Sequence, residues 1–351
     1  MKILHVAPMN VAGVPYNMMD MQRRFGHDAR LVTLHANDLT FPEDICLDLP
    51  LFRNPLSQAW RSFKGKQNNT SGPLVLRPHN LFEKLFFSAD DWSRSHRVMA
   101  AIHKHRLDDF PIVHYDGGLD FFRDARIARR WKAAGKKIVC HYMGSDLRLR
   151  GVHPVMDELS DLNLTNESDH LNLHNNIHYL YIPFDTFLFP VRTSENKRLR
   201  ILHSPSKRAM KGTSLILPVL EKLKRIRDID FILVENIPHG EVLRIKQRCD
   251  IAIEQIGNMG GTGYGRNSLE NLAFGIPTIT EMTEDYTAWL PENPFILADA
   301  TSLLDRLVDL IDNPQLRQEK RIHGRRWVEH YHSYDSVHAR LMSLYRDHGI
   351  A

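Results

Sequence analysis

Short apolar strands alternate with helices along most of the chain, and the alternation occurs in both halves of the sequence. In the first half, β-branched apolar runs predict strands at 2–7, 30–34, 112–115 and 137–142, and helical spacing of apolar residues predicts helices at 16–25, 90–105 and 120–134. In the second half, strands are predicted at 198–203, 230–235, 250–255 and 277–281, with helices at 214–227, 240–248 and 267–274. Strands alternating with helices form parallel sheets, so the predicted fold class is α/β with two doubly wound, Rossmann-like domains.

The alternation restarts near residue 190, and 351 residues are enough for two domains at about 100–200 residues each. We therefore predict an N-terminal domain over 1–190 and a C-terminal domain over 191–330, followed by a final helical segment over 331–351. Residues 52–78 are rich in Asn, Gly, Ser and Pro, which predicts an irregular loop.

Composition excludes several classes of protein. Lys and Arg number 46 against 42 Asp and Glu, and this excess of +4 argues against a nucleic-acid partner. The three cysteines are far apart, so they predict neither a disulfide framework nor a cysteine-rich zinc module. The sequence shows no signal peptide, and no apolar stretch reaches the ~18–20 residues of a membrane span. These features favour a cytoplasmic protein.

The glycine-rich segment 257–265 follows a predicted strand and precedes a predicted helix. Glycines let the backbone approach a ligand closely, and the helix start offers free N–H groups, an arrangement that suits a diphosphate. Glu270 in the following helix could accept hydrogen bonds from the two hydroxyls of a ribose. The alternative is structural, because Asn267 and Glu270 also have the spacing of a capping box.

A second loop, 203–212, carries Lys207, Arg208 and Lys211 between a strand and a helix. A fixed cation beside a helix start can neutralise phosphates without a metal ion. Lys211, followed by Gly212 at the helix entry, is the strongest candidate of the three. The alternative is that all three are solvated surface cations.

Together, these two loops resemble those of the retaining glycosyltransferases of the GT-B fold, the large glycogen-synthase-like group (family four-like). The resemblance rests on Lys211-Gly212 and on the segment 269–279, which matches the group's Glu-Ala-x-Ala-x-Gly-x-Pro-Val motif. Gly26-His27 and the segment 141–146 are similar to N-terminal motifs of the same group, and the segment 326–345 is similar to its closing helices.

The resemblance implies two domains that face each other across a cleft, with a last helix that crosses back to the first domain. It implies a nucleotide-sugar co-substrate, a UDP-sugar rather than a GDP-sugar, with no cofactor and no metal. It also implies transfer with retention, in which the leaving phosphate helps to deprotonate the acceptor and Lys211 is a catalytic residue. The implied donor-site residues are Gly13, Ser206, Arg208, Lys211, Thr262, Gly263, Tyr264, Gly265, Arg266, Asn267, Ser268 and Glu270. Thr262 and Ser206 stand where relatives have Glu and Arg, which leaves the donor sugar open.

Two aspartates of the first domain are candidate catalytic residues on the acceptor side. Asp116 and Asp146 follow predicted strands, where open α/β sheets bind their ligands. Asp116 could orient an acceptor hydroxyl; its alternative is a turn residue before Gly117. For Asp146 the alternative is an ion pair with Arg148. His114 and His141 are interpreted as core residues of their strands.

The predicted helix 120–137 carries Arg123, Arg126, Arg130 and Lys137 on one face. Such a face could contact anionic lipid at the inner membrane surface or an anionic acceptor, although a solvated outer face is the alternative. The acceptor class stays open between a glycan, a lipid-linked molecule and a protein. Asp90 and Asp91 are interpreted as a helix N-terminal charge pair rather than a metal site.

Three other functions remain as alternatives. The chain could be a non-catalytic relative that binds a nucleotide-sugar or a glycan, or an epimerase or phosphorylase of the same fold. An NAD-dependent oxidoreductase is disfavoured, because neither half carries the glycine fingerprint of a dinucleotide site.

Overall fold

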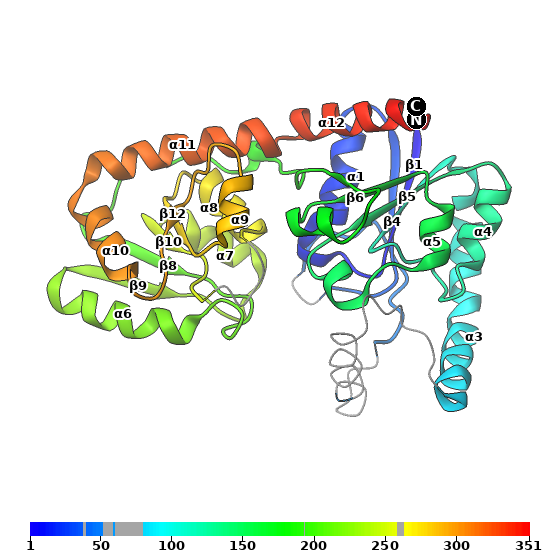
Figure 1. The fold of residues 1–351 in the computed structure, drawn as a ribbon, viewed down its shortest axis with the longest axis horizontal. Helices are drawn as coiled ribbons and strands as arrows, with labels where there is room; N and C mark the ends of the chain where they lie inside the picture. Colours follow the sequence, from blue (N-terminus) through cyan, green and yellow to red (C-terminus); the bar gives the residue numbers. More distant parts are fainter. Residues whose placement is uncertain (38–39, 52–58, 60–79, 193, 258–262) are drawn as a thin grey trace. The chain divides into compact units, whose positions relative to one another are not determined.

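The computed structural model describes the chain except for residues 38–39, 52–58, 60–79, 193 and 258–262 (Figure 1). It contains two compact units, and each is described by itself. Unit 1 comprises Met1–Pro183 with His338–Ala351, and unit 2 comprises Phe184–Val337. The loop predicted over 52–78 lies almost entirely outside the described residues.

Unit 1 is built on a sheet of seven parallel strands in the order β3-β2-β1-β4-β5-β6-β7. The strands are β1 (Lys2–Ala7), β2 (Asp28–Thr33), β3 (Ile45–Cys46), β4 (Ile112–Asp116), β5 (Lys137–Tyr142), β6 (Leu162–Thr165) and β7 (His178–Tyr179). All four strands predicted for this half are confirmed.

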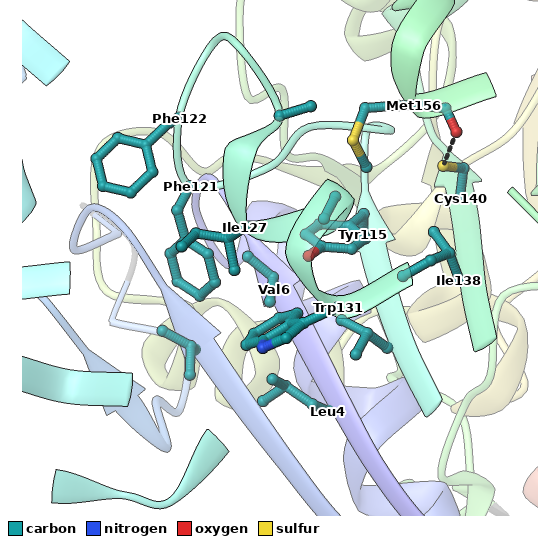
Figure 2. Close-up of a cluster of buried hydrophobic side chains, with 14 of the residues drawn as sticks. Leu4, Val6, Tyr115, Phe121, Phe122, Ile127, Trp131, Ile138, Cys140 and Met156 are labelled. Atoms are coloured by element: carbon teal, nitrogen blue, oxygen red, sulfur yellow. Dashed lines mark hydrogen bonds between the residues drawn. The ribbon is translucent and has the colours of Figure 1, made fainter. Parts of the chain in front are cut away.

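Helices cover this sheet. They are α1 (Val14–Arg24), α3 (Leu81–Lys104), α4 (Arg126–Ala133), α5 (Pro154–Leu159) and α12 (Tyr334–Asp347), of which the residues from His338 on belong to this unit. The short helical turns are η1 (Val11–Gly13), η2 (Leu107–Asp109), η3 (Asp146–Arg150) and η4 (Ser168–Asn172). Figure 2 shows how the core forms: Leu4 and Val6 of β1 and Tyr115 of β4 face Trp131 of α4, which is 1% exposed. This burial of large apolar side chains fixes α4 on the sheet.

Two predicted helices have different boundaries. The helix predicted from residue 120 begins only at Arg126, because Ala125 has a left-handed backbone with φ 56°. The buried carboxylate of Asp120 accepts a hydrogen bond from the N–H of Ile127 at 3.0 Å and so holds the start of α4. Helix α3 begins at Leu81, nine residues earlier than predicted, and the side chain of Asn80 accepts the N–H of Glu83 at 2.8 Å and caps the helix.

Unit 2 contains five parallel strands in the order β12-β11-β10-β8-β9. The strands are β8 (Leu199–His203), β9 (Ile229–Leu233), β10 (Ile251–Ile253), β11 (Thr278–Thr280) and β12 (Ile296–Leu297). The helices are η5 (Thr186–Leu188), α6 (Thr213–Ile226), α7 (His239–Lys246), α8 (Arg266–Ala273), α9 (Glu284–Trp289), α10 (Leu303–Asp312) and α11 (Pro314–His332). The apolar side chains of these strands pack against α6 and α10 in a second core.

Both sheets reverse their strand order once, as the predicted doubly wound fold requires. In unit 1 the reversal lies between β1 and β4, and in unit 2 it lies between β8 and β10. At such a switch point, the loops that leave the two strands diverge to opposite faces and open a crevice at the carboxyl edge of the sheet. Each unit therefore has one topologically favoured place for a ligand. Within the described part of the chain, no helix has the length and apolar character needed to cross a membrane.

Candidate functional site

The loops after β8 and β10 meet at the switch point of unit 2. The N–H of Ile256 donates to the carbonyl of Lys211 at 3.3 Å, and Gly212 has a left-handed backbone with φ 63°. A Cβ atom on Gly212 would lie 1.6 Å from the carbonyl oxygen of Ile256. Only glycine fits this close contact, so Gly212 sets the position of Lys211 beside the second loop.

Lys211 forms an ion pair with a buried carboxylate. Its Nζ contacts Oε1 of Glu254, and it lies 3.3 Å from Oε1 of Gln255. The side chain of Glu254 is fully buried, whereas that of Lys211 is 17% exposed. Burial raises the pKa of Glu254, but Lys211, Lys246 and the hydrogen bond from Asn267 together outweigh this effect and hold that pKa below its usual value.

Asn267 joins this pair to the start of α8. Its amide donates to Oε2 of Glu254 at 2.5 Å, and its Oδ1 accepts the hydroxyl of Ser204 at 2.9 Å. The ammonium of Lys246, on α7, donates to the backbone carbonyl of Asn267 at 3.0 Å. The loop after β8, the end of β10 and the N-terminal turn of α8 are thus held in one polar network.

Glu270 lies deeper in the same network, and both of its carboxylate oxygens are occupied. Oε1 accepts from Nε2 of His239 at 2.7 Å and from Nε of Arg266 at 3.0 Å, while Oε2 accepts from Nζ of Lys246 at 2.8 Å. Burial raises the pKa of Glu270, but Lys246 and the other donors together lower it well below its usual range.

The capping interpretation of Glu270 is wrong. Helix α8 has Gly265 as its N-cap residue and Arg266 as its first residue, so Glu270 lies beyond the first turn. No side chain accepts a hydrogen bond at the cap. A helix N-terminus without a side-chain cap is a place that favours an anion.

The other residues predicted for the donor site are more scattered. Ser206 is exposed, and Arg208 is directed to Glu235, with its Nη2 2.7 Å from Oε2. Tyr264 belongs to an aromatic cluster: its ring centroid lies 5.3 Å from that of Trp327, and its hydroxyl lies 3.0 Å from Nε2 of His332.

The two glycines beside Tyr264 differ in their packing: a Cβ atom on Gly265 would meet no atom within 4 Å. A Cβ atom on Gly263 would lie 1.6 Å from the ring of Tyr286. Ser268 is buried on α8, and its hydroxyl has no hydrogen-bond partner among the described groups. Thr262 lies outside the described residues. Gly13 is the buried N-cap residue of α1, in the loop after β1, and therefore belongs to unit 1.

Several residues of the network were missed from the sequence. Glu254 had a usable signal, because it directly follows a short apolar strand at the carboxyl edge of the sheet. Ser204 directly follows β8 in the same way. His239 and Lys246 carried no such signal in the sequence, because they lie on a polar helix. Only the folded chain shows that the ammonium of Lys246 is buried.

In unit 1, Asp116 ends β4 at the switch point and is 1% exposed. Neither of its carboxylate oxygens accepts a hydrogen bond from the described residues, and Oδ1 lies 3.6 Å from Nδ1 of His141. The turn that follows is made by Gly117 and Gly118, both with positive φ. A buried carboxylate without donors is costly, so a turn role alone does not account for Asp116.

Asp146 lies beside this turn. Its Oδ2 would be 3.4 Å from a Cβ atom on Gly117, and its Oδ1 lies 3.3 Å from Nη2 of Arg150. Burial raises its pKa, and Arg150 opposes the rise. The expected ion pair with Arg148 is wrong, because Arg148 binds Asp169 at 2.6 Å.

The two histidines interpreted as core residues are buried. His114 contacts the hydroxyl of Tyr345 through Nε2, and Tyr345 belongs to α12. Burial lowers the pKa of His114 well below its usual value. The interpretation of His114 and His141 as core residues of β4 and β5 is confirmed.

The basic face predicted over 120–137 does not form as one helical surface. Arg123 precedes α4 and Lys137 belongs to β5. Carboxylates also neutralise these cations: Arg123 lies 2.7 Å from Asp90, Arg126 lies 2.9 Å from Asp124, Arg130 lies 2.5 Å from Asp108, and Lys137 lies 3.8 Å from Asp161.

The interpretation of Asp90 and Asp91 as a helix N-terminal pair is also wrong, because both lie in the interior of α3. They are buried, and Arg94 and Arg123 contact them. Over the residues that the structure describes, no cluster of His, Cys, Asp and Glu has the arrangement needed to hold a metal ion.

No protein-family model matches the sequence, and no curated protein matches it significantly. Solved structures do resemble the fold over nearly its whole length. HepE from Anabaena in complex with UDP is 10% identical with a TM-score of 0.59, and the match covers 99% of this chain and 100% of that chain. Sucrose-phosphate synthase from Thermosynechococcus elongatus is 12% identical with a TM-score of 0.63, covering 99% of both chains.

An alpha-glucosyltransferase in complex with UDP-glucose and DNA is 10% identical with a TM-score of 0.61, and the match covers 98% of this chain and 99% of that chain. At this level of identity the similarity concerns the fold, and it agrees with the predicted two-domain GT-B architecture. The chain therefore has the GT-B fold.

Proposed function

We propose that the chain is a glycosyltransferase that moves a sugar from a UDP-sugar to an acceptor. The observation that carries the proposal is the position of Lys211, held at the β8/β10 switch point in one network with the first turn of α8. A cation and a helix start at one strand edge provide what a leaving diphosphate needs. Structures of this fold in complex with UDP or UDP-glucose support the choice of nucleotide.

In this proposal, Lys211 and the N–H groups of Arg266, Asn267 and Ser268 bind the diphosphate. Gly263 and Gly265 allow the backbone to approach it, and Thr262, Tyr264, Ser206 and Arg208 belong to the surrounding loops. A ribose would bind Glu270 by replacing His239 and Arg266 as its donors, while Lys246 keeps the carboxylate charged. Gly13, in the loop after β1, would contact the donor from the first domain.

Asp116 is proposed to orient the acceptor hydroxyl, and Asp146 to hold Arg150 beside it. A hydroxyl donor would satisfy the unpartnered carboxylate of Asp116. We propose transfer with retention, without a metal, in which the leaving phosphate takes the acceptor proton. The proposed domains are 1–190 and 191–330, with the last helical segment, 331–351, crossing back to the first. The free cysteines Cys46, Cys140 and Cys249 fit a cytoplasmic location.

The test is UDP release from a panel of UDP-sugars, measured with the full chain in the presence and absence of a mixed acceptor pool. The proposal predicts release that depends on the acceptor. Conversion of the donor without any acceptor, seen by NMR, would identify an epimerase instead. Tight UDP-sugar binding with no release under any condition would identify a binding relative.

A further inference from the structure

A cavity of about 860 Å³ lies in unit 1 beside the switch point of its sheet. Its lining includes Pro8 after β1, Leu34 after β2 and the segment 119–124 after β4. The inner side of α3 forms another wall. Such a volume fits a small ligand or a headgroup, at the edge where parallel sheets bind ligands.

Cations outnumber carboxylates among the residues that line this cavity. Six cations line it against three carboxylates: the cations are Lys84, Arg94, Arg123, Arg126, Arg129 and Arg150, and the carboxylates are Asp91, Asp120 and Asp124. Four of the arginines contact carboxylates, whereas Lys84 and Arg129 have no carboxylate partner in the described part of the chain. These two cations favour an anionic ligand.

Aromatic rings hold two of these arginines flat. The guanidinium of Arg123 stacks 4.3 Å from the ring centroid of Phe87, and that of Arg126 stacks 4.2 Å from that of Phe122. Both guanidinium groups also bind carboxylates: Arg123 contacts Asp90 and Asp91, and Arg126 contacts Asp124. The cavity therefore combines apolar walls with two cations, Lys84 and Arg129, that remain for an anionic group.

The outer side of α3 is apolar and exposed. We name it the α3 stripe: Leu81, Phe82 and Leu85, which are 73%, 87% and 62% exposed. At 100° per residue these three side chains fall within about 100° of arc, while the cavity-lining Lys84, Phe87, Asp91 and Arg94 fall on the other side. Trp92, which is 81% exposed, also lines the cavity. A surface helix of a soluble domain normally turns its apolar side inward, so the reversed orientation indicates a partner.

We propose that the α3 stripe lies in the interface of a membrane and that the cavity receives the phosphate-bearing headgroup of a lipid from it. Charge complementarity selects this occupant, because cations line the cavity directly behind the apolar stripe on the same helix, and apolar side chains next to cations bind anionic bilayers. The identification of this lipid as the acceptor rests on the proposed function. The binding of the lipid does not depend on that function. Arg123 and Arg126 of the 120–137 segment also line the cavity, but carboxylates pair with both, so the proposal rests on the α3 stripe and on Lys84 and Arg129.

The experiment is sedimentation of the full chain with phosphatidylcholine vesicles, with and without phosphatidate. The wild type is expected to bind the phosphatidate vesicles. Phe82→Ser/Leu85→Ser is expected to weaken this binding by at least about 100-fold, since two large apolar side chains no longer enter the interface. Phe187→Ser/Leu188→Ser is the matched control, because these side chains are 86% and 69% exposed on unit 2, and it should bind as the wild type does.

The cavity is tested separately with Arg129→Gln, which should weaken the binding of phosphatidate vesicles by about 5-fold. Its control is Arg130→Gln, on the same helix but outside the cavity lining, which should leave the binding of phosphatidate vesicles unchanged. Full release from the vesicles by glycerol phosphate would overturn the lipid source and indicate a free phosphate ester.

The membrane assignment would be overturned if the wild type bound none of the vesicles, or if Phe82→Ser/Leu85→Ser bound the phosphatidate vesicles as the wild type does. It would also be overturned if the wild type were a dimer that this variant converts to monomers, because a second copy of the chain would then cover the α3 stripe. UDP affinity, measured on the same samples, separates the two proposals. If UDP does not bind, the proposed donor site is wrong, whereas the result with the vesicles is unaffected.

Discussion

Lys211 and Glu254 form an ion pair at the point where the loops after β8 and β10 meet, and only the lysine reaches solvent. The pair is therefore asymmetric. Glu254 is fully buried and keeps Asn267 as its remaining donor if Lys211 is lost, whereas Lys211 can turn to water if Glu254 is lost. This asymmetry shapes any test of the nucleotide site, because removing the lysine leaves an uncompensated buried charge.

The first prediction concerns the stability of this pair. Lys211→Met should lower the free energy of unfolding by about 3 kcal/mol, because Glu254 stays buried without its cation. Glu254→Gln should cost only about 1 kcal/mol, and the double variant should cost less than Lys211→Met alone. Urea unfolding of the four proteins measures the difference. Equal losses in the two single variants would show that the pair is not asymmetric.

The second prediction concerns Glu270 and Lys246, which lie 2.8 Å apart in the interior. Glu270→Ala should lower the free energy of unfolding by about 3–5 kcal/mol, since it leaves the buried ammonium of Lys246 without its carboxylate partner. Adding Lys246→Met should recover part of this loss. Glu241→Ala, an exposed change on α7, serves as the control and should stay within about 0.5 kcal/mol. A Glu270→Ala variant as stable as this control would contradict the network.

The third prediction separates two glycines. Gly212→Ala should cost more than about 2 kcal/mol and should also weaken UDP binding, because its Cβ meets the carbonyl of Ile256 and displaces Lys211. Gly240→Ala, in α7, meets no atom within 4 Å and should raise stability by about 0.5–1 kcal/mol. Thermal unfolding and a UDP titration of both variants check this contrast, and similar effects at the two sites would refute it.

The fourth prediction is a pH dependence. Burial raises the pKa of Asp120 from 3.8 to about 6. The folded state therefore holds this proton more tightly than the unfolded chain, and the resulting stability is present below pH 3.8 and lost as pH rises through about 6. Relative to Asp120→Asn, the wild type should lose about 3 kcal/mol of stability across this window. Urea midpoints of both proteins from pH 4 to 7 test this, and parallel curves would disprove it.

The fold was largely predictable because its main strands are continuous apolar runs between loops. Strands β3, β7 and β12 are only two residues long and carry no periodicity, so no pattern marks them. The start of α3 was missed because its first turns have an exposed apolar side, which a search for inward-facing apolar residues does not recognise. The end of the sequence-predicted helix 120–134 was nearly right, but its start depends on the left-handed backbone of Ala125.

The candidate site was predictable in part. Lys211, Asn267 and Glu270 were placed from loop chemistry, and the structure brings all three into one network. Their partners could not be read from the sequence, since Lys246 and His239 reach the network only through the packing of α7 against α8. Arg208 shows the reverse case, in which a cation at a suggestive position pairs instead with an acidic neighbour, Glu235.

The most direct test of the account is a calorimetric titration of UDP into Glu254→Gln and into Lys211→Met/Glu254→Gln. Because neither protein contains the buried carboxylate, the comparison isolates the lysine. We predict that UDP binds the first protein and that affinity falls at least about 10-fold in the second, with Lys207→Met/Glu254→Gln unchanged. Equal UDP affinity in all three proteins, or no UDP binding to any of them, would contradict the assignment of the nucleotide site.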